Sequence, residues 1–325
     1  MNTTNSIEMG VYTSMPDSEI NLDGSEEMIE TKYGNIKVVI YGDKKSGHPL
    51  VTFHDIGMNS DMNFNNFFTF LTPTKLIKRF CVYNINAPGQ EFGASKLPAG
   101  IKSFIGFGTG AGTNVLLRYA LKHSNSVDAL VLINPILQKA GWIEWFYQKL
   151  NLNSLRNGKM PSFTVDYFMW HFFGRHIEEC NPDAVKQYKS YFYSQQKPWN
   201  LSLFVDSFLN RNELALSDNL KNLKVPMLVI VGNNSAFIDE SVYANSQFDP
   251  KMTEWLKISD SSGLVLEDKP AEVAQAFLLF LQGRGFCCDL NISKIVSSLK
   301  GELQSINKSQ QQHNLTLEKV DEFGL

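Results

Sequence analysis

A run of alternating glycines at residues 103–112, Ser-Phe-Ile-Gly-Phe-Gly-Thr-Gly-Ala-Gly, has the spacing of a turn that presents a catalytic side chain. An apolar strand precedes the run and a helix-forming stretch follows it, so the glycines fit a tight turn between the two. Such a turn normally carries Ser, Cys or Asp at its centre, two residues from a glycine on each side. With Gly106 and Gly110 as the outer glycines, the central residue is Gly108. The sequence therefore predicts the turn without its nucleophile.

In α/β-hydrolases the nucleophile works with an acid and a histidine that follow it in the chain. The acid is expected after the strand that ends at Gly232, where this chain has Asn233 and Ser235. The histidine is expected after the last strand, where Leu264 fills the place, and residues 177–312 contain no histidine. Without a base, a hydroxyl group stays protonated and weakly nucleophilic at neutral pH. Because all three positions are changed, we predict that the chain is not an enzyme.

One part of a catalytic pocket is retained in the segment His54-Asp55-Ile56-Gly57, which follows a predicted strand. Hydrolases carry oxyanion loops at this place, and their backbone N–H groups could still bind a carboxylate or a carbonyl. We interpret His54 and Asp55 as residues that pack and hydrogen-bond the loop. Thr109 is expected to point away from the pocket, because the turn aims only its central residue. The candidate vestigial pocket comprises His54, Asp55, Gly57, Gly108 and Thr109.

No cofactor or metal site is predicted. His171 and His176 are five residues apart and do not share one helical face as a metal-binding pair would. The spacing Gly106-x-Gly108-x-x-Ala111 is similar to a dinucleotide-binding loop. However, it lies outside the first strand–helix unit, and no strand ending in an acid follows at the required distance.

The elements that must position these residues alternate between strands and helices, which predicts a mostly parallel sheet covered by helices. Helices alone are predicted from about residue 141 to 223, as in a helical cap inserted into an α/β-hydrolase fold. Pro182 and Pro198 are expected to begin two of these helices. We expect a flexible leader at residues 1–26, the α/β domain at 27–286, and a tail at 287–325 with an amphipathic helix at 290–306.

The composition excludes several classes of protein. The net charge is −3 and there is no run of Lys and Arg, so no nucleic acid is expected as a partner. No stretch approaches the roughly 18 apolar residues of a membrane-spanning helix. The first residues lack the pattern of a signal peptide, and the four cysteines fit free thiols in a reducing compartment. The prediction is a cytoplasmic protein with 43% hydrophobic and 19% charged residues, values that are ordinary for a globular chain.

These motifs resemble the N-myc downstream-regulated (NDRG) family, whose members are non-catalytic members of the α/β-hydrolase superfamily. The resemblance covers residues 28–286 and rests on the loop at residues 54–59, Asn86-Ala87-Pro88-Gly89, the glycine run at 106–112, Arg118-Tyr119-Ala120-Leu121 and Asn210-Arg211. It implies a cytoplasmic protein that acts through partners in differentiation, stress response, signalling or trafficking. Two alternatives stay open. The first is an apolar small-molecule or lipid binder that uses the vacated pocket, and the second is an unorthodox hydrolase that uses Thr109 or Asp55.

One segment departs from the family pattern. Only sixteen residues, Gln90–Ile105, separate Gly89 from Gly106, and most of them are unfavourable for a helix. The family places a full helix in this crossover. A connection of about a dozen residues can still join two parallel strands. We therefore expect the missing helix to leave part of one sheet face uncovered, unless the tail helix or a partner covers it. A skipped exon or an error in the gene sequence would also account for the short crossover.

Overall fold

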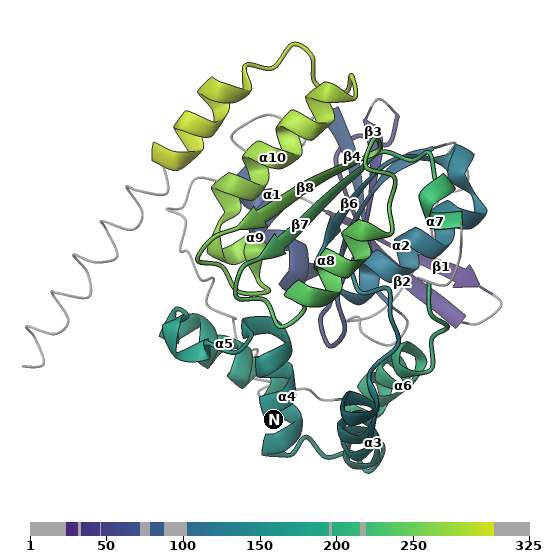
Figure 1. Ribbon diagram of the computed structural model, residues 1–325, viewed down its shortest axis with the longest axis vertical. Coiled ribbons are helices and arrows are strands. Elements are labelled where there is room, and N and C mark those ends of the chain that lie inside the picture. Colours follow the sequence, from purple (N-terminus) through teal and green to yellow (C-terminus); the bar gives the residue numbers. More distant parts are fainter. Residues whose placement is uncertain are drawn as a thin grey trace, which may run out of the picture. The chain divides into compact units, whose positions relative to one another are not determined.

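The computed structural model describes residues 24–31, 34–45, 47–71, 79–87, 103–194, 197–214 and 219–301. An eight-stranded sheet forms its centre, with the strand order β1-β2-β4-β3-β5-β6-β7-β8 (Figure 1). The strands are β1 (Ser25–Thr31), β2 (Gly34–Tyr41), β3 (His48–Phe53), β4 (Phe80–Ile85), β5 (Phe104–Thr109), β6 (Val127–Ile133), β7 (Met227–Gly232) and β8 (Thr253–Ile258).

The sheet is mostly parallel, as the sequence predicts. Strand β2 pairs antiparallel with β1 and with β4, whereas every pairing among β4, β3, β5, β6, β7 and β8 is parallel. Strands β1 and β2 are consecutive in the chain, and Thr31 and Gly34 are partners at the end of their ladder. The first strand begins at Ser25, which lies inside the predicted leader. Parallel strands need buried faces on both sides, and β5, β6 and β7 accordingly consist almost wholly of buried residues.

Helices cover both faces of the sheet, and the alternation of side chains along β5 separates the two faces. Phe107 points to one face, where its ring contacts Phe64, Phe67 and Phe277. A Cβ added to Gly106 or Gly108 would lie on the other face, close to Leu116 of α2. The elements on these two faces are η1 (Asp61–Asn65), α1 (Asn66–Leu71), α9 (Val265–Asp268) and α10 (Pro270–Gly283) on the first, and α2 (Ala111–Lys122) and α8 (Ile238–Ser246) on the second.

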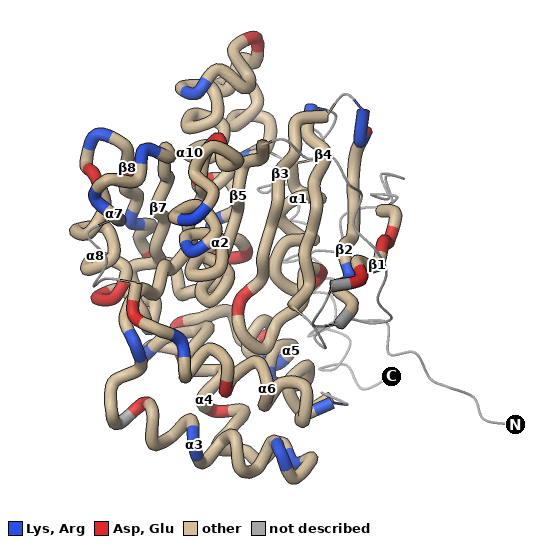
Figure 2. Tube along the Cα trace, turned by 90° about the vertical axis from the view of Figure 1, so that its right-hand side faces the viewer, with Lys and Arg blue, Asp and Glu red and all other residues tan. Residues whose placement is uncertain are grey.

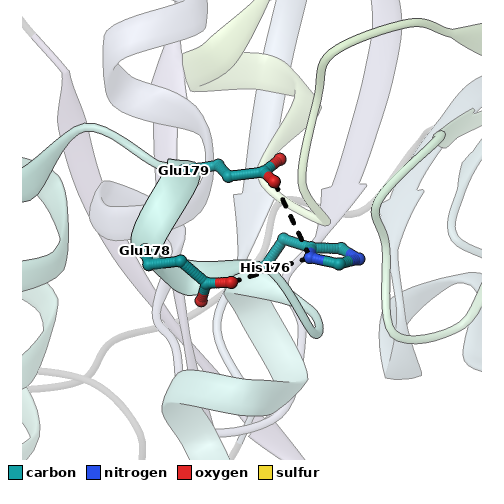
Figure 3. Close-up of side chains that lie close together, drawn as sticks. All are labelled: His176, Glu178 and Glu179. Carbon is teal, nitrogen blue, oxygen red and sulfur yellow. Dashed lines mark ion pairs between the residues drawn. The ribbon is translucent and has the colours of Figure 1, made fainter.

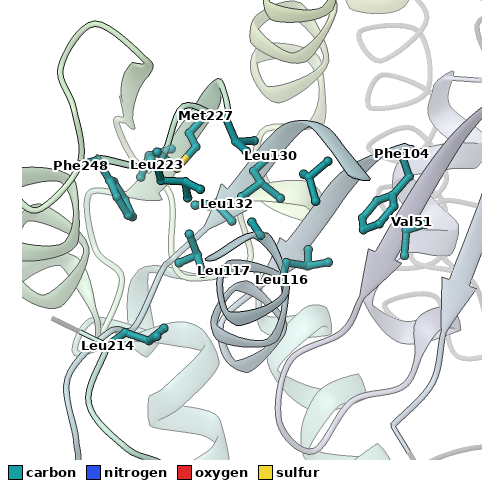
Figure 4. Close-up of a cluster of buried hydrophobic side chains, with 14 of the residues drawn as sticks. Val51, Phe104, Leu116, Leu117, Leu130, Leu132, Leu214, Leu223, Met227 and Phe248 are labelled. Atoms are coloured by element: carbon teal, nitrogen blue, oxygen red, sulfur yellow. The ribbon is translucent and has the colours of Figure 1, made fainter. Parts of the chain in front are cut away.

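The hydrophobic core on the α2 side is continuous across the sheet. Leu116 and Leu117 of α2 lie in one cluster with Leu130 and Leu132 of β6 (Figure 4). Met227 of β7 and Phe248, which follows α8, extend the cluster towards the β8 edge. Because these side chains come from elements far apart in the sequence, the core fixes the order in which the strands lie side by side.

Between β6 and β7 the described chain is helical, with α3 (Trp142–Arg156), α4 (Ser162–Phe173), η5 (Ile177–Glu179), α5 (Pro182–Tyr193), α6 (Pro198–Leu209) and α7 (Asn219–Asn222). Helices α3 to α6 gather at one end of the sheet in both views, and we call them the cap (Figures 1 and 2). The predicted proline starts are confirmed: Pro182 and Pro198 each occupy a first-turn position. Charged residues gather in the cap, in loops and at helix ends, whereas β3, β4 and β5 carry none (Figure 2).

The chain divides into two compact units, residues 22–290 and the two ends, 1–21 with 291–325. In the second unit, residues 292–301 form a helix within the predicted range 290–306, and residues 302–306 lie outside the described residues. Residues 90–102 of the short crossover also lie outside them. None of the helices in the described ranges combines the length and the hydropathy that a bilayer crossing requires.

Candidate functional site

The carboxyl ends of the parallel strands meet beneath cap helix α4 and form the candidate site. Asp55 follows β3, Gly110 follows β5 and Gly263 follows β8. Helix α4 closes over them, because the Gly263 N–H donates to the backbone oxygen of Phe172. A Cβ on Gly57, which has φ +75°, would touch the Phe168 ring at 3.1 Å. In open α/β sheets, ligand sites lie at this edge.

The turn between β5 and α2 is made by Gly110, so the prediction that Gly108 stands at its centre is wrong. Gly108 lies inside β5, and Gly110 has φ 45° and ψ −112°, a conformation that L side chains rarely adopt. A Cβ on Gly108 would lie 2.9 Å from backbone atoms of Gly112 and Thr113, so Gly108 allows close packing of α2 on the strand. Glycine at every second position gives two equivalent registers of the motif, and only the backbone dihedrals distinguish them.

The space beside Gly110 is filled by the Asp55 side chain. A Cβ placed on Gly110 would lie 2.1 Å from the Asp55 carboxyl group, so the two cannot coexist without movement. Asp55 Oδ1 accepts hydrogen bonds from the N–H of Ile56 at 2.6 Å and of Ala111 at 2.8 Å. These are the kinds of donors that form an oxyanion hole, one following the turn residue and one in the loop after β3. The carboxylate of the chain itself therefore occupies this pair of donors.

His171 of the cap holds the other carboxylate oxygen. Its Nε2 lies 3.0 Å from Asp55 Oδ2, and both side chains are buried. Burial alone would raise the pKa of Asp55. The charge and hydrogen bond of His171, with those of the Ala111 and Ile56 amides, outweigh burial and hold this pKa below its usual value. Asp55 is thus an ionised acceptor at neutral pH, and Nε2 of His171 carries the donated proton.

His54 is fully buried and serves the backbone of the loop. The Ala87 N–H donates to His54 Nε2 at 2.9 Å, so Nε2 is the unprotonated nitrogen and Nδ1 donates to the backbone oxygen of Asp55 at 2.7 Å. Burial lowers the pKa of His54 to about 4. The imidazole is therefore neutral at pH 7, and each of its two nitrogens already forms a hydrogen bond within the protein.

Thr109 is also engaged within the protein. Its hydroxyl group donates to Asn63 Oδ1 at 2.7 Å, and the same oxygen accepts the Asp55 N–H at 2.7 Å. The structure thus brings together four of the five predicted pocket residues, namely His54, Asp55, Gly57 and Thr109. At the turn, the residue in the pocket is Gly110 and not Gly108. The sequence reasoning missed Asn63 and His171. Asn63 lies only eight residues after Asp55, so its position in the sequence weakly indicated a contact with the loop. His171 lies 116 residues from Asp55, and nothing in the sequence indicated their contact.

The residues predicted at the acid and histidine places, Asn233, Ser235 and Leu264, lie in the loops that follow β7 and β8. Ser235 follows β7, is buried, and its hydroxyl oxygen accepts the N–H of Phe237 at 3.2 Å. Asn233 is exposed. Leu264 follows β8, is buried, and precedes α9. Asn134, after β6, donates from Nδ2 to the backbone oxygen of Gly263 at 2.8 Å and ties two of these loops together.

A separate group of potential metal ligands lies on the cap surface. His176 Nδ1 lies 3.7 Å from Glu178 Oε1 and 3.8 Å from Glu179 Oε1 (Figure 3). All three side chains are exposed on a single turn of helix, and none has a further side-chain hydrogen bond among the described residues that would orient it. His171 lies apart from this group, because it faces Asp55. We assign no metal to these residues.

Sequence comparison establishes the family. The profile of the Ndr family matches residues 26–103 and 99–288. The chain belongs to the Ndr family. Among its relatives, protein NDRG4-B of Xenopus laevis is 32% identical over 315 residues and covers 89% of this chain and 84% of its own length. Protein NDRG2 of Xenopus tropicalis is 32% identical over 309 residues, with coverages of 88% and 84%. The resemblance inferred from the motifs is thereby confirmed.

Solved structures similar to this Ndr-family chain are α/β-hydrolases, which confirms the predicted fold class. An esterase from Thermogutta terrifontis has a TM-score of 0.65 at 17% identity and covers 80% of this chain and 98% of its own. A hydrolase from Pseudomonas aeruginosa PA01 has a TM-score of 0.62 at 17% identity, with coverages of 80% and 99%. At these identities the likeness shows the fold alone.

The family profile matches in two stretches that meet at residues 99–103. This junction falls within the short crossover that precedes β5. The break in the match therefore lies in the segment where the chain departs from the family pattern.

Proposed function

We propose that this protein is a non-enzymatic member of the α/β-hydrolase superfamily that acts by binding protein partners. The observation that carries the proposal is the Asp55 carboxylate, which accepts both backbone donors at the turn and fills the space where a nucleophile on residue 110 would stand. A substrate carbonyl would have to displace an ionised, buried side chain to reach those donors. On this proposal, Asn233 or Ser235 and Leu264 replace the acid and the base.

The surface of the cap supports a binding role. Trp142 of α3 is 81% exposed, and Trp145, Phe146 and Tyr147 on the same helix are also exposed. Aromatic side chains gathered on a surface are typical of sites that contact other proteins. We include in the proposal a cytoplasmic location and a role in signalling, differentiation, stress response or trafficking, which the family resemblance implies.

The proposal is tested by measuring the turnover of p-nitrophenyl acetate, p-nitrophenyl butyrate and p-nitrophenyl phosphate by the purified protein. We expect rates that do not exceed those of the variants Asp55→Asn and Thr109→Val. Asp166→Asn, on the exposed surface of α4, is the matched control for the aspartate. A turnover lost in Asp55→Asn or Thr109→Val and kept in Asp166→Asn would overturn the proposal in favour of the unorthodox hydrolase.

The apolar-ligand alternative has less support. The two amide donors that would hold the head group of a lipid are occupied by Asp55. A cavity whose wall includes Phe237 is lined by several charged side chains, among them Arg211 and Glu240. An apolar molecule would remove water from these charges without giving them partners, which is unfavourable. We therefore do not extend the proposal to lipids.

A further inference from the structure

A cavity of about 340 Å³ lies at the boundary between the cap and the sheet domain. The loop after β6 forms one wall, the first turn of α3 and the segment after α6 form the second, and the start of α8 forms the third. Its lining residues are Ile136, Gln138, Lys139, Gly141, Glu144, Arg211, Glu213, Phe237 and Glu240. The volume equals that of about eleven water molecules, at roughly 30 Å³ each. A small organic molecule fits within it.

Five charged side chains line this cavity without pairing with one another. Lys139 and Arg211 are the cations, and Glu144, Glu213 and Glu240 are the anions. Among the residues that the structure describes, none of the five forms an ion pair within 4.0 Å. Elsewhere on the cap, lysine and arginine do pair with acids, as Lys149 and Arg156 do with Asp206. The opposite charges of this lining therefore form no direct ion pair with one another among the described residues.

Arg211 is held in place as an unpaired cation. Its Nη1 donates to the backbone oxygen of Phe208 at 2.6 Å and its Nη2 to that of Gln138, while the guanidinium lies 3.7 Å from the centre of the Phe208 ring. Its Nε is buried without a hydrogen-bond partner. Burial lowers the pKa of Arg211 to about 10, so it stays charged at neutral pH. Only neutral groups surround this cation within bonding distance.

The carboxylates on the cavity wall are also incompletely compensated. Glu144 accepts a hydrogen bond from the Tyr167 hydroxyl group at 3.2 Å. Glu240 is half-buried, and burial raises its pKa. Charged groups withdrawn from water without a counter-charge are unfavourable, and a ligand that supplies the counter-charges removes this cost. Ile136 and Phe237 add an apolar surface on which a short aliphatic chain can pack.

We propose that the cavity binds a small zwitterion that carries an ammonium group and a carboxylate group, of the amino acid class. The carboxylate pairs with Arg211 and Lys139, and the ammonium group pairs with Glu144, Glu213 and Glu240. A ligand with only a carboxylate would meet three glutamates, and one with only an amine would meet two cations, so a ligand with both charges is preferred. Binding here is independent of whether the site at Asp55 is catalytic.

The cavity adjoins the Asp55 site through two contacts. The centre of the Phe237 ring, on the cavity wall, lies 4.6 Å from the centre of the His171 ring. The centre of the Tyr167 ring lies 6.1 Å from the centre of the same His171 ring. Phe237 and the Glu144–Tyr167 bond thus connect the ligand position with the histidine that holds Asp55.

The proposal is tested by isothermal titration calorimetry and saturation-transfer NMR with 4-aminobutyrate and 6-aminohexanoate. The matched single-charge probes are butyrate with butylamine and hexanoate with hexylamine. We expect at least one zwitterion to bind ten-fold more tightly than both of its single-charge analogues. A zwitterion that binds no better than its amine or its carboxylate, or no binding at all, would overturn the proposal.

Three variants locate the binding. Lys139→Gln, Glu213→Gln and Glu240→Gln each remove one charge from the lining, and we expect each to raise Kd about ten-fold. Lys122→Gln on α2 and Glu272→Gln on α10 are exposed controls that should leave Kd unchanged. Equal Kd values in lining and control variants would contradict the assignment of this cavity.

A lipid head group could offer the same pair of charges as a free zwitterion. Vesicles of phosphatidylethanolamine and phosphatidylcholine, compared with soluble phosphoethanolamine, distinguish these sources by co-sedimentation. We expect no enrichment of the protein on the vesicles. Binding seen with vesicles and with none of the soluble zwitterions would overturn the assignment to a free small molecule. The turnover assay for the proposed function is a different measurement, so either proposal can fail while the other stands.

Discussion

At the scale of single residues, Gly110 and Asp55 depend on each other. Gly110 has no Cβ, and the Asp55 carboxylate lies in the space that a Cβ would need. The carboxylate in turn satisfies the N–H groups of Ile56 and Ala111, which would otherwise be buried without partners. The loss of a side chain at residue 110 and the position of Asp55 are therefore two aspects of one arrangement.

The substitution Gly110→Ala should lower the free energy of unfolding by about 3 kcal/mol or more, because it adds backbone strain and displaces Asp55 from its donors. Chemical denaturation measures this loss. Gly283→Ala is the matched control, since a Cβ there meets nothing within 4 Å at the end of α10, and it should be neutral or slightly stabilising. A Gly110→Ala protein as stable as the Gly283→Ala protein would show that Asp55 does not fill this space.

His54 should make stability depend on pH. Its pKa of about 4 in the folded protein lies below its ordinary value of 6.5, so between these pH values the unfolded chain binds more protons. The contribution of His54 to the free energy of unfolding is therefore complete above pH 6.5 and falls as the pH is lowered towards 4, by about 3 kcal/mol at most. Urea denaturation at pH 7, 6 and 5 should show a smaller fall in His54→Gln than in the wild type. Parallel curves for the two proteins would exclude this role.

At the scale of elements, the cap is joined to the sheet domain by a partly buried hydrogen bond between α5 and α9. The hydroxyl group of Tyr188 donates to Glu267 Oε1 at 2.6 Å. Burial raises the pKa of Glu267 to about 7, even though the bond from Tyr188 acts in the opposite direction. The Oδ2 atom of the neighbouring Asp268 accepts hydrogen bonds from the side chains of Ser261 and Ser262. Glu267 therefore changes its charge near neutral pH at a contact between the two layers.

Because the pKa of Glu267 is higher in the folded than in the unfolded protein, its contribution to stability is complete below about pH 4.5 and is lost as the pH rises through 7. Glu267→Gln keeps the acceptor and cannot ionise. We expect this variant to gain about 1 to 2 kcal/mol on the wild type between pH 5 and pH 8, since the carboxyl group is only partly shielded from solvent. Thermal unfolding at both pH values measures the difference, and an equal difference at both would rule out the ionisation of Glu267 as its cause.

At the scale of the whole molecule, residues 22–290 contain the entire sheet and its core, and they form one of the two compact units. A chain limited to these residues should fold cooperatively, because the central parallel strands β5, β6 and β7 are buried on both faces. Circular dichroism and thermal unfolding of residues 22–290 would test this, with the full chain as the reference. A fragment without a cooperative transition would show that the two ends are needed for the fold.

The sequence by itself determined the mostly parallel sheet, the helical insertion between β6 and β7, and the absence of histidine from residues 177–312. Apolar strands that alternate with helices leave few ways to bury their side chains, and a missing residue type is visible without coordinates. The glycine at the turn and the charged groups around the cavity could not be assigned in this way. Glycines at residues 106, 108, 110 and 112 fit the motif in two registers, and only the positive φ of Gly110 selects one.

The tertiary structure alone decided what occupies the site. Asp55 is hydrogen-bonded to Ala111, 56 residues away in the sequence, and to His171, 116 residues away. These residues come into contact only when β3, β5 and α4 pack together. The same packing places Lys139, Arg211 and Glu240 from three different segments around one cavity. Contacts of this kind depend on the three-dimensional path of the chain, and no local spacing encodes them.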